Sequence, residues 1–131
     1  MTLLLNIDAP DIEAAERFYT AAFGLTVGRR LGADFVELLG WSAPVYLLRK
    51  DAGTVGAGQD LRRYDRHWTP IHADVVVDDL DQAVARAVAA GAVIEHPART
   101  TPYGAIAMLA DPFGHGFCLI AFNAQGYDAL L

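Results

Sequence analysis

Apolar residues recur at helical spacing in two segments of the chain, residues 11–24 and 79–91. An aspartate starts each segment and a glycine ends it, as N-cap and C-terminal stop signals do. This pattern predicts two amphipathic helices that each bury one face. The apolar positions are Ile12, Ala15, Phe18, Tyr19, Ala22 and Phe23 in the first segment, and Leu80, Ala83, Val84, Ala87 and Val88 in the second.

Short runs rich in Leu, Val and Ile surround both predicted helices and predict strands. Residues 3–8 precede the first helix, and "LTVGRRL", "DFVELLG" and "VYLLRK" follow it. "HADVVVDD" precedes the second helix, and "AVIEHP", "AIAMLAD" and "GFCLIAF" follow it. Residues 51–69, with three glycines and few apolar residues, are expected to form a connecting loop.

The order of one strand, one helix and three strands therefore occurs twice, and "PDIEAA" aligns with "DDLDQA" when Asp11 is placed on Asp79. The fold class expected is α+β, with two tandem βαβββ modules that form a curved mixed sheet around a central cavity and carry their helices outside. We expect one domain over residues 1–131, with module 1 at about 1–50, the loop at about 51–69, module 2 at about 70–123 and a C-terminal tail at 124–131.

Composition excludes several classes of function. A chain of 131 residues with 53% hydrophobic and 20% charged residues is expected to fold. A net charge of -6 argues against nucleic acid as a partner, because such surfaces need clustered Lys and Arg. No apolar run approaches the length of a membrane span, and the first residues lack the pattern of a signal peptide. The single cysteine requires no oxidising compartment, so a cytoplasmic location without membrane partners is expected.

Two stretches carry a resemblance to a known family: "LLLNIDAPDIEAAERFYTAAFGL" in the first half, and "IHADVVVDDLDQAVARAVAAGAVIEHP" with "ADPFGHGFCLI" in the second. Together they resemble the two modules of vicinal oxygen chelate proteins, the superfamily of glyoxalase I, extradiol dioxygenases, methylmalonyl-CoA epimerase, and fosfomycin and bleomycin resistance proteins. The likeness covers nearly the whole chain. It implies the fold more firmly than the function, since members share a scaffold and differ in chemistry.

In metal-using relatives, four positions meet in the cavity, and the resemblance places them at Leu4, Tyr46, His72 and Cys118. Leucine cannot coordinate an ion and tyrosine is an uncommon ligand, so this set leaves a divalent metal short of donors. We therefore expect no metal cofactor; if a divalent metal is bound, its ligands would be His72, Cys118 and Tyr46. A shift of one residue in strand register would offer Asn6 or Glu37 instead.

Two functions remain open. The first is a metal-free binding protein, of the resistance or sequestration kind, whose cavity holds a small apolar or aromatic molecule. The second is a metal-dependent enzyme, a glyoxalase-type lyase or isomerase or a dioxygenase, that acts on a substrate with vicinal oxygens. The residues expected to line the cavity are Leu4, Asn6, Tyr46, Trp68, His72, Asp74, Tyr103, Phe113 and Cys118.

Simpler roles compete with these assignments. Cys118 lies in an apolar run where a free cysteine usually packs as a small hydrophobe, and Tyr46 could serve packing alone. His72 is expected to be a polar wall of the cavity, and Trp68 to belong to a mobile lid formed by residues 51–69. A homodimer is expected because two-module relatives commonly pair and the "TLLLNI" strand offers apolar surface.

Overall fold

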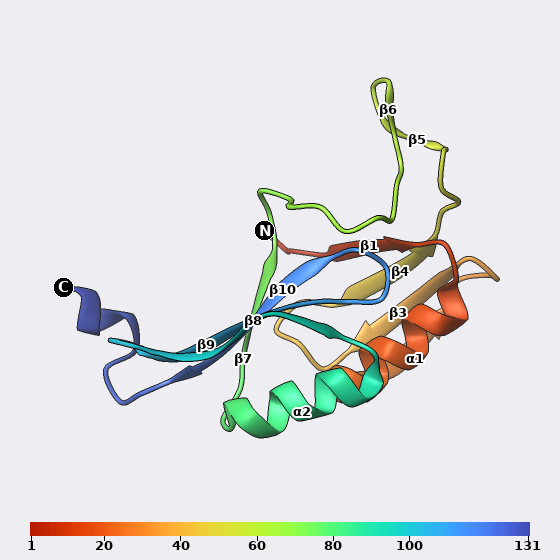
Figure 1. Ribbon diagram of the computed structural model, residues 1–131. Helices are drawn as coiled ribbons and strands as arrows, with labels where there is room; N and C mark the ends of the chain where they lie inside the picture. The colour runs from red at the N-terminus through yellow and green to blue at the C-terminus, as the bar shows by residue number, and fades with distance from the viewer. The chain divides into compact units, whose positions relative to one another are not determined.

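The strand–helix–strand–strand–strand order occurs twice in the computed structural model, which describes residues 1–131. One copy lies in each of two units, Met1–Asp65 and Arg66–Leu131. Figure 1 shows the helix of each unit lying along one face of that unit's own sheet. The prediction of an α+β fold with two tandem βαβββ modules is confirmed.

The first unit contains a four-stranded sheet in the order β1-β4-β3-β2. Strand β1 is parallel to β4, whereas β3 is antiparallel to both β4 and β2. The crossover from β1 runs through α1, as a parallel connection requires. The elements are β1 (Leu5–Ala9), α1 (Ile12–Phe23), β2 (Thr26–Arg30), β3 (Phe35–Leu39) and β4 (Val45–Arg49).

The second unit repeats this topology in the order β7-β10-β9-β8. Here β7 is parallel to β10, and β9 pairs antiparallel with β10 and with β8. The two sheets therefore have the same strand order and the same pattern of directions. The elements are β7 (Ala73–Val76), α2 (Leu80–Ala90), β8 (Val93–Thr101), β9 (Gly104–Ala110) and β10 (Gly116–Phe122).

Helix α1 forms where the apolar spacing predicts it. The Asp11 carboxylate accepts a hydrogen bond from the Ala14 N–H at 2.9 Å, which satisfies a donor that the first helical turn leaves open. Gly24 ends the helix at φ 68°, a left-handed conformation that favours glycine. The predicted apolar face is buried at Ile12, Ala15, Phe18, Tyr19 and Ala22.

Helix α2 begins at the same kind of cap, since Asp79 accepts from the Gln82 N–H at 3.0 Å. Its apolar face is narrower than the sequence predicts. Leu80 and Ala87 are buried, but Val88 is 43% exposed. At 3.6 residues per turn, Val88 lies at the margin of the stripe centred on Leu80 and Ala87, which explains its exposure.

Each sheet has a face covered by its helix and a second face. In the first unit, β3 and β4 bury Val36, Leu38, Val45 and Leu47 on one face. Because side chains alternate along a strand, Glu37 and its cross-strand partner Tyr46 lie on the other face. In the second unit the same alternation puts Phe117 and Leu119 on one face of the sheet and Cys118 on the other. Asp74, in register with Cys118, shares the face of Cys118.

Two short elements lie in segments predicted as loop and tail. Within residues 51–69, β5 (Val55–Ala57) and β6 (Asp60–Leu61) form a small hairpin that projects beyond β4 in Figure 1. Arg62 fixes its base, donating to Asp8 on β1 at 2.7 Å. Near the C-terminus, η1 (Gly126–Leu130) forms a turn of 3-10 helix after β10. Neither α1 nor α2 is long and apolar enough to cross a lipid bilayer.

Candidate functional site

Three side chains that can bind a metal or a polar ligand meet on the second unit's sheet. His72 immediately precedes β7, Asp74 lies two residues later within β7, and Cys118 is the cross-strand partner of Asp74 on β10. Their ligand atoms all lie within 4.8 Å of one another. We call these residues the polar trio. The parallel β7–β10 register brings them together, although Asp74 and Cys118 are 44 positions apart in the sequence.

The members of the polar trio lie in contact with one another. The His72 Nε2 atom lies 3.1 Å from the Asp74 Oδ1 atom. Burial, the charge of Asp74 and a hydrogen bond to its carboxylate together raise the pKa of the Cys118 thiol to about 11. The thiol is therefore protonated at neutral pH and donates to Asp74. In this state Cys118 is a hydrogen-bond donor and not a nucleophile.

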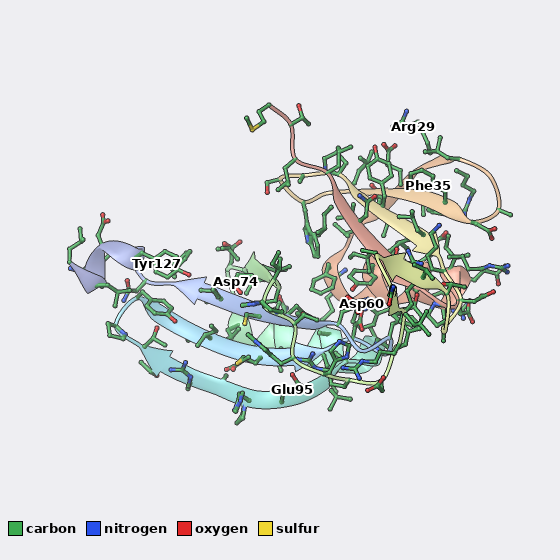
Figure 2. All side chains as sticks on the ribbon, turned by 90° about the horizontal axis from the view of Figure 1, so that it is seen from above. Arg29, Phe35, Asp60, Asp74, Glu95 and Tyr127 are labelled. Atoms are coloured by element: carbon green, nitrogen blue, oxygen red, sulfur yellow. The ribbon has the colours of Figure 1, made fainter.

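Aromatic rings lie at both ends of the polar trio. The Trp68 ring centroid is 5.3 Å from that of His72. At the other end, Tyr127 of η1 lies 4.8 Å from Phe122 and 5.1 Å from Tyr103, centroid to centroid, in edge-to-face geometry. Figure 2 shows Asp74 and Tyr127 beside β10.

The Tyr127 ring is close enough to the polar trio to be influenced by its charges. Burial raises the pKa of the Tyr127 hydroxyl, and the Asp74 carboxylate raises it as well. Tyr127 nevertheless remains 52% exposed, so its ring is accessible from solvent. The sequence offered no signal for Tyr127, because it lies in a polar tail without periodicity.

The other predicted site residues occupy different places. Phe113 lies in the turn before β10 and is 8% exposed, and its N–H donates to Asp111 Oδ1 at 2.8 Å. In the first unit, Leu4 is 50% exposed, Asn6 is exposed on β1, and Tyr46 is 7% exposed on β4. Asn6 and Tyr46 are cross-strand partners, as Asp74 and Cys118 are in the second unit.

A second polar cluster lies in the first unit. The Arg29 guanidinium donates to both carboxylate oxygens of Glu37, at 2.9 Å to Oε2 and 2.6 Å to Oε1. The Tyr46 hydroxyl donates to Glu37 Oε1 at 2.8 Å. The sequence predicts Glu37 only as an alternative under a shifted register and does not predict Arg29. The available signal was one charged residue inside the apolar run "FVELL".

A hollow of about 480 Å³ lies at the start of α2, and another of about 410 Å³ at the start of α1. Neither contains a residue that the sequence analysis assigned to the cavity. The first is lined by Asp78, Asp79, Leu80, Asp81, Ala98, Arg99, Thr100 and Ala105.

The polar trio has the donor chemistry of a zinc-like site. An imidazole nitrogen, a carboxylate oxygen and a thiolate sulfur are all ligands of Zn²⁺, and catalytic zinc sites supply three protein ligands and keep one position open. Magnesium and calcium prefer oxygen donors only, so the trio does not suit them. Binding would require loss of the Cys118 proton. This set keeps His72 and Cys118 from the predicted ligands and adds Asp74, whereas Tyr46 belongs to the first unit.

Comparison with known proteins identifies several relatives. The family model of the glyoxalase-like domain matches residues 5–120. The anthracycline biosynthesis protein DnrV of Streptomyces peucetius is 34% identical over 125 residues, which cover 90% of this chain and 40% of that protein. DauV of Streptomyces sp. strain C5, also described as an anthracycline biosynthesis protein, is 35% identical over 122 residues, which cover 91% of this chain and 40% of that protein. The chain thus spans less than half the length of these curated relatives.

Solved structures with the same fold share little sequence with this chain. TioX from Micromonospora sp. ML1 superimposes with a TM-score of 0.73 at 21% identity, covering 94% of this chain and 99% of that one. The fosfomycin resistance protein FosX of Listeria monocytogenes superimposes with a TM-score of 0.72 at 16% identity, covering 95% of each chain. At these identities the likeness establishes the fold.

Proposed function

The chain belongs to the glyoxalase-like family of the vicinal oxygen chelate superfamily, and from this premise we propose that it binds a small planar aromatic molecule. The binding surface is the face of the second unit's sheet that carries the polar trio. The observation that carries the proposal is the placement of Trp68 at one end of the trio and of Tyr103, Phe122 and Tyr127 at the other.

Aromatic side chains suit such a ligand because they offer stacking surface at little entropic cost, while a few polar groups fix its orientation. His72 and Asp74 supply those groups at the polar trio. The two relatives described as anthracycline biosynthesis proteins support an aromatic ligand class, although this chain spans only 40% of each. Binding would serve sequestration of the compound or its presentation for modification.

Tyr127 provides the first test. The purified chain is titrated with 1,4-dihydroxyanthraquinone, a planar three-ring compound, by fluorescence. Tyr127→Ala removes the stacking ring and is expected to raise Kd by about 2- to 12-fold, the equivalent of about 0.5–1.5 kcal/mol for an aromatic pair. Tyr127→Phe keeps the ring and serves as the matched control, with a Kd close to that of the wild type. Absence of binding, or an unchanged Kd in Tyr127→Ala, would contradict the proposal.

His72 provides the second test. Its imidazole exposes 29% of the side chain and can offer one hydrogen bond to a ligand oxygen. His72→Asn is expected to weaken binding of 1,4-dihydroxyanthraquinone by roughly 0.5–1.5 kcal/mol without unfolding the protein. Loss of all binding together with loss of a bound ion would point to a metal role for His72.

A metal-dependent enzyme is the second candidate function, and the donor set of the polar trio favours it. A bound ion would polarise vicinal oxygens of a substrate as a Lewis acid. The discriminating measurement is elemental analysis of tag-free protein before and after dialysis against Zn²⁺, Ni²⁺, Mn²⁺ or Fe²⁺. A metal content of one equivalent per chain that is lost in His72→Asn would favour the metal-dependent enzyme over the binding protein. Metal far below one equivalent would support the binding protein.

A further inference from the structure

The cluster of Arg29, Glu37 and Tyr46 lies on the face of the first unit's sheet that α1 does not cover. Strand alternation places Glu37 and Tyr46 on this face, opposite the buried Val36 and Leu47. Figure 2 labels Arg29 and Phe35 on this part of the molecule. The polar trio, in the second unit, contains none of these residues.

Glu37 is the fixed centre of the cluster. It is 6% exposed, and its two oxygens accept four hydrogen bonds. Three come from Arg29, through its backbone N–H at 3.2 Å and its guanidinium at 2.9 and 2.6 Å. The fourth comes from the Tyr46 hydroxyl at 2.8 Å. A buried carboxylate requires such pairing, and the bidentate contact holds the guanidinium plane in one orientation.

The backbone of β2 is shaped for this contact. The β2–β3 register shifts between Val27 and Arg30, which marks a bulge at Gly28 and Arg29. A Cβ atom at Gly28 would lie 2.7 Å from Glu37 Oε2, closer than side-chain contacts allow. A side chain at this position would displace the Glu37 carboxylate from its present place beside the Arg29 N–H. Bulges of this kind redirect side chains, and they are frequent beside binding sites.

Arg29 retains donors that the cluster does not use. Its Nε and Nη2 atoms bond to Glu37, and Nη2 also lies 3.2 Å from the Tyr46 hydroxyl. The two N–H groups of Nη1 have no partner in the structure, and 65% of the Arg29 side chain is exposed. The side-on pairing therefore leaves two fixed donors that a ligand can reach from solvent.

The charge of the cluster limits what these donors can bind. The Glu37 carboxylate already neutralises the Arg29 guanidinium, so an incoming anion would meet little net positive charge. A neutral oxygen acceptor can accept hydrogen bonds from the two N–H groups and does not need a net positive charge. Phe35 lies beside the cluster, with its ring centroid 5.3 Å from that of Tyr46, and provides an apolar surface for a flat molecule.

We propose that Arg29 is the ligand-binding residue of a second site, contained in the first unit, where its Nη1 donors hold a neutral carbonyl oxygen of an aromatic ketone or quinone. The aromatic class of the compound rests on the proposed function. The acceptor chemistry rests on the Arg29–Glu37–Tyr46 geometry alone.

The test compares three flat probes that differ in their oxygen atoms: 9,10-anthraquinone, anthracene and anthracene-9-carboxylate. Arg29→Met is expected to weaken anthraquinone binding by about 10-fold or more, the range for hydrogen bonds to a charged donor. Anthracene binding is expected to change by less than about 2-fold, because it offers no acceptor. Arg30→Met is the matched control. Arg30 is the neighbouring arginine, bound to Glu16 at 2.8 and 2.9 Å, and its loss should alter neither affinity.

Arg29→Lys provides a second variant in case Arg29→Met leaves Glu37 too poorly paired for the chain to fold. Lysine supplies one ammonium to Glu37 and has no second nitrogen for a ligand, so the same loss of anthraquinone affinity is expected. Thermal melting of each variant confirms that it is folded before titration.

Several results would overturn the inference. An equal loss for anthraquinone and anthracene would assign Arg29 a packing role. A greater loss for anthracene-9-carboxylate than for anthraquinone would make the site an anion site. Wild-type binding of all three probes with no effect of either Arg29 variant would refute the inference and leave the proposed function standing. Failure of the wild type to bind any probe would refute both.

Discussion

Cys118 and Glu37 show how two ionisable side chains that are both buried come to opposite charge states through their neighbours. Each lies on the sheet face that its unit's helix does not cover. Burial favours the neutral form of Cys118, which is 3% exposed, and its acidic neighbour Asp74 acts in the same direction. Glu37, 6% exposed, has a basic neighbour in Arg29, so its charged form is favoured. For Glu37 the hydrogen bonds from Arg29 and Tyr46 therefore outweigh the effect of burial, whereas for Cys118 the neighbour reinforces it.

The Cys118 thiol is expected to react slowly with iodoacetamide at pH 8. Its pKa of about 11 leaves a thiolate fraction about 100-fold smaller than that of an unperturbed cysteine, and burial blocks access as well. Mass spectrometry of alkylated protein over time measures the rate. The same protein in 8 M urea, a concentration chosen to unfold it, is the control and should react at the rate of a free thiol. Equal rates in both states would contradict this protonation.

Glu37 is expected to make stability depend on pH in the acid range. Pairing with Arg29 lowers its pKa from 4.5 to about 2 in the folded protein. Because the folded pKa is the lower one, the stabilisation is present above about pH 4.5 and disappears as pH falls from 4.5 toward 2. Urea unfolding of the wild type and of Glu37→Gln over this range measures the effect. The difference in unfolding free energy between them should shrink as pH falls, and parallel profiles would contradict the assignment.

At the scale of elements, both units begin their helices at an aspartate cap and end them at a glycine, and a further glycine shapes a hairpin of the second unit. The β8–β9 hairpin of the second unit turns through Gly104, which has φ 139° and faces β10. A Cβ atom there would overlap the backbone carbonyl oxygen of Ala121 and lie 2.9 Å from the Asn123 N atom. Glycine is thus required both by the backbone conformation and by the close approach of β10.

Gly104→Ala is expected to lower the free energy of unfolding by about 3 kcal/mol or more, because it combines backbone strain with a backbone overlap. Gly58→Ala is the matched control. Gly58 also has a positive φ, 60°, but nothing lies within 4 Å of its added Cβ, so the expected cost is about 1 kcal/mol. Urea unfolding followed by circular dichroism measures both. Equal losses of unfolding free energy in the two variants would show that the close approach of β10 adds no cost at Gly104.

For the whole molecule, the two units present the same arrangement of strands with different chemistry. The cross-strand pair Asn6 and Tyr46 in the first unit corresponds to Asp74 and Cys118 in the second. The two sheet faces are equivalent in topology, but one carries the polar trio and the other the Arg29–Glu37 pair. This is consistent with a superfamily whose members share a scaffold and differ in their sites.

A homodimer remains a prediction at this scale. The N-terminal segment exposes apolar side chains, with Leu3 at 73% and Leu4 at 50%, and a second copy could cover them. Size-exclusion chromatography with light scattering should give the mass of two chains, and Leu3→Glu should shift it toward one. Val55→Glu, at a similarly exposed position on the β5–β6 hairpin, is the control and should remain dimeric. A wild-type mass of one chain at micromolar concentration would refute the prediction.

The sequence by itself determined the elements and their duplication. Helical spacing and the Asp11 and Asp79 caps are local signals, so they predicted α1 and α2 without knowledge of the sheet. Alternating apolar runs likewise predicted most strands. The β5–β6 hairpin was missed because its short strands are exposed and lie among glycines, which resembles a loop.

Only the tertiary structure decided which polar side chains meet. The parallel β7–β10 register places Asp74 opposite Cys118, and the bulge in β2 turns Arg29 onto Glu37. Register and bulges depend on packing between strands that are distant in sequence, and a shift of one residue would move every side chain of a strand to the opposite face. The sequence could therefore indicate His72 and Cys118 as neighbours through resemblance, whereas the grouping of Asp74 with them and the Arg29–Glu37–Tyr46 cluster required the folded chain.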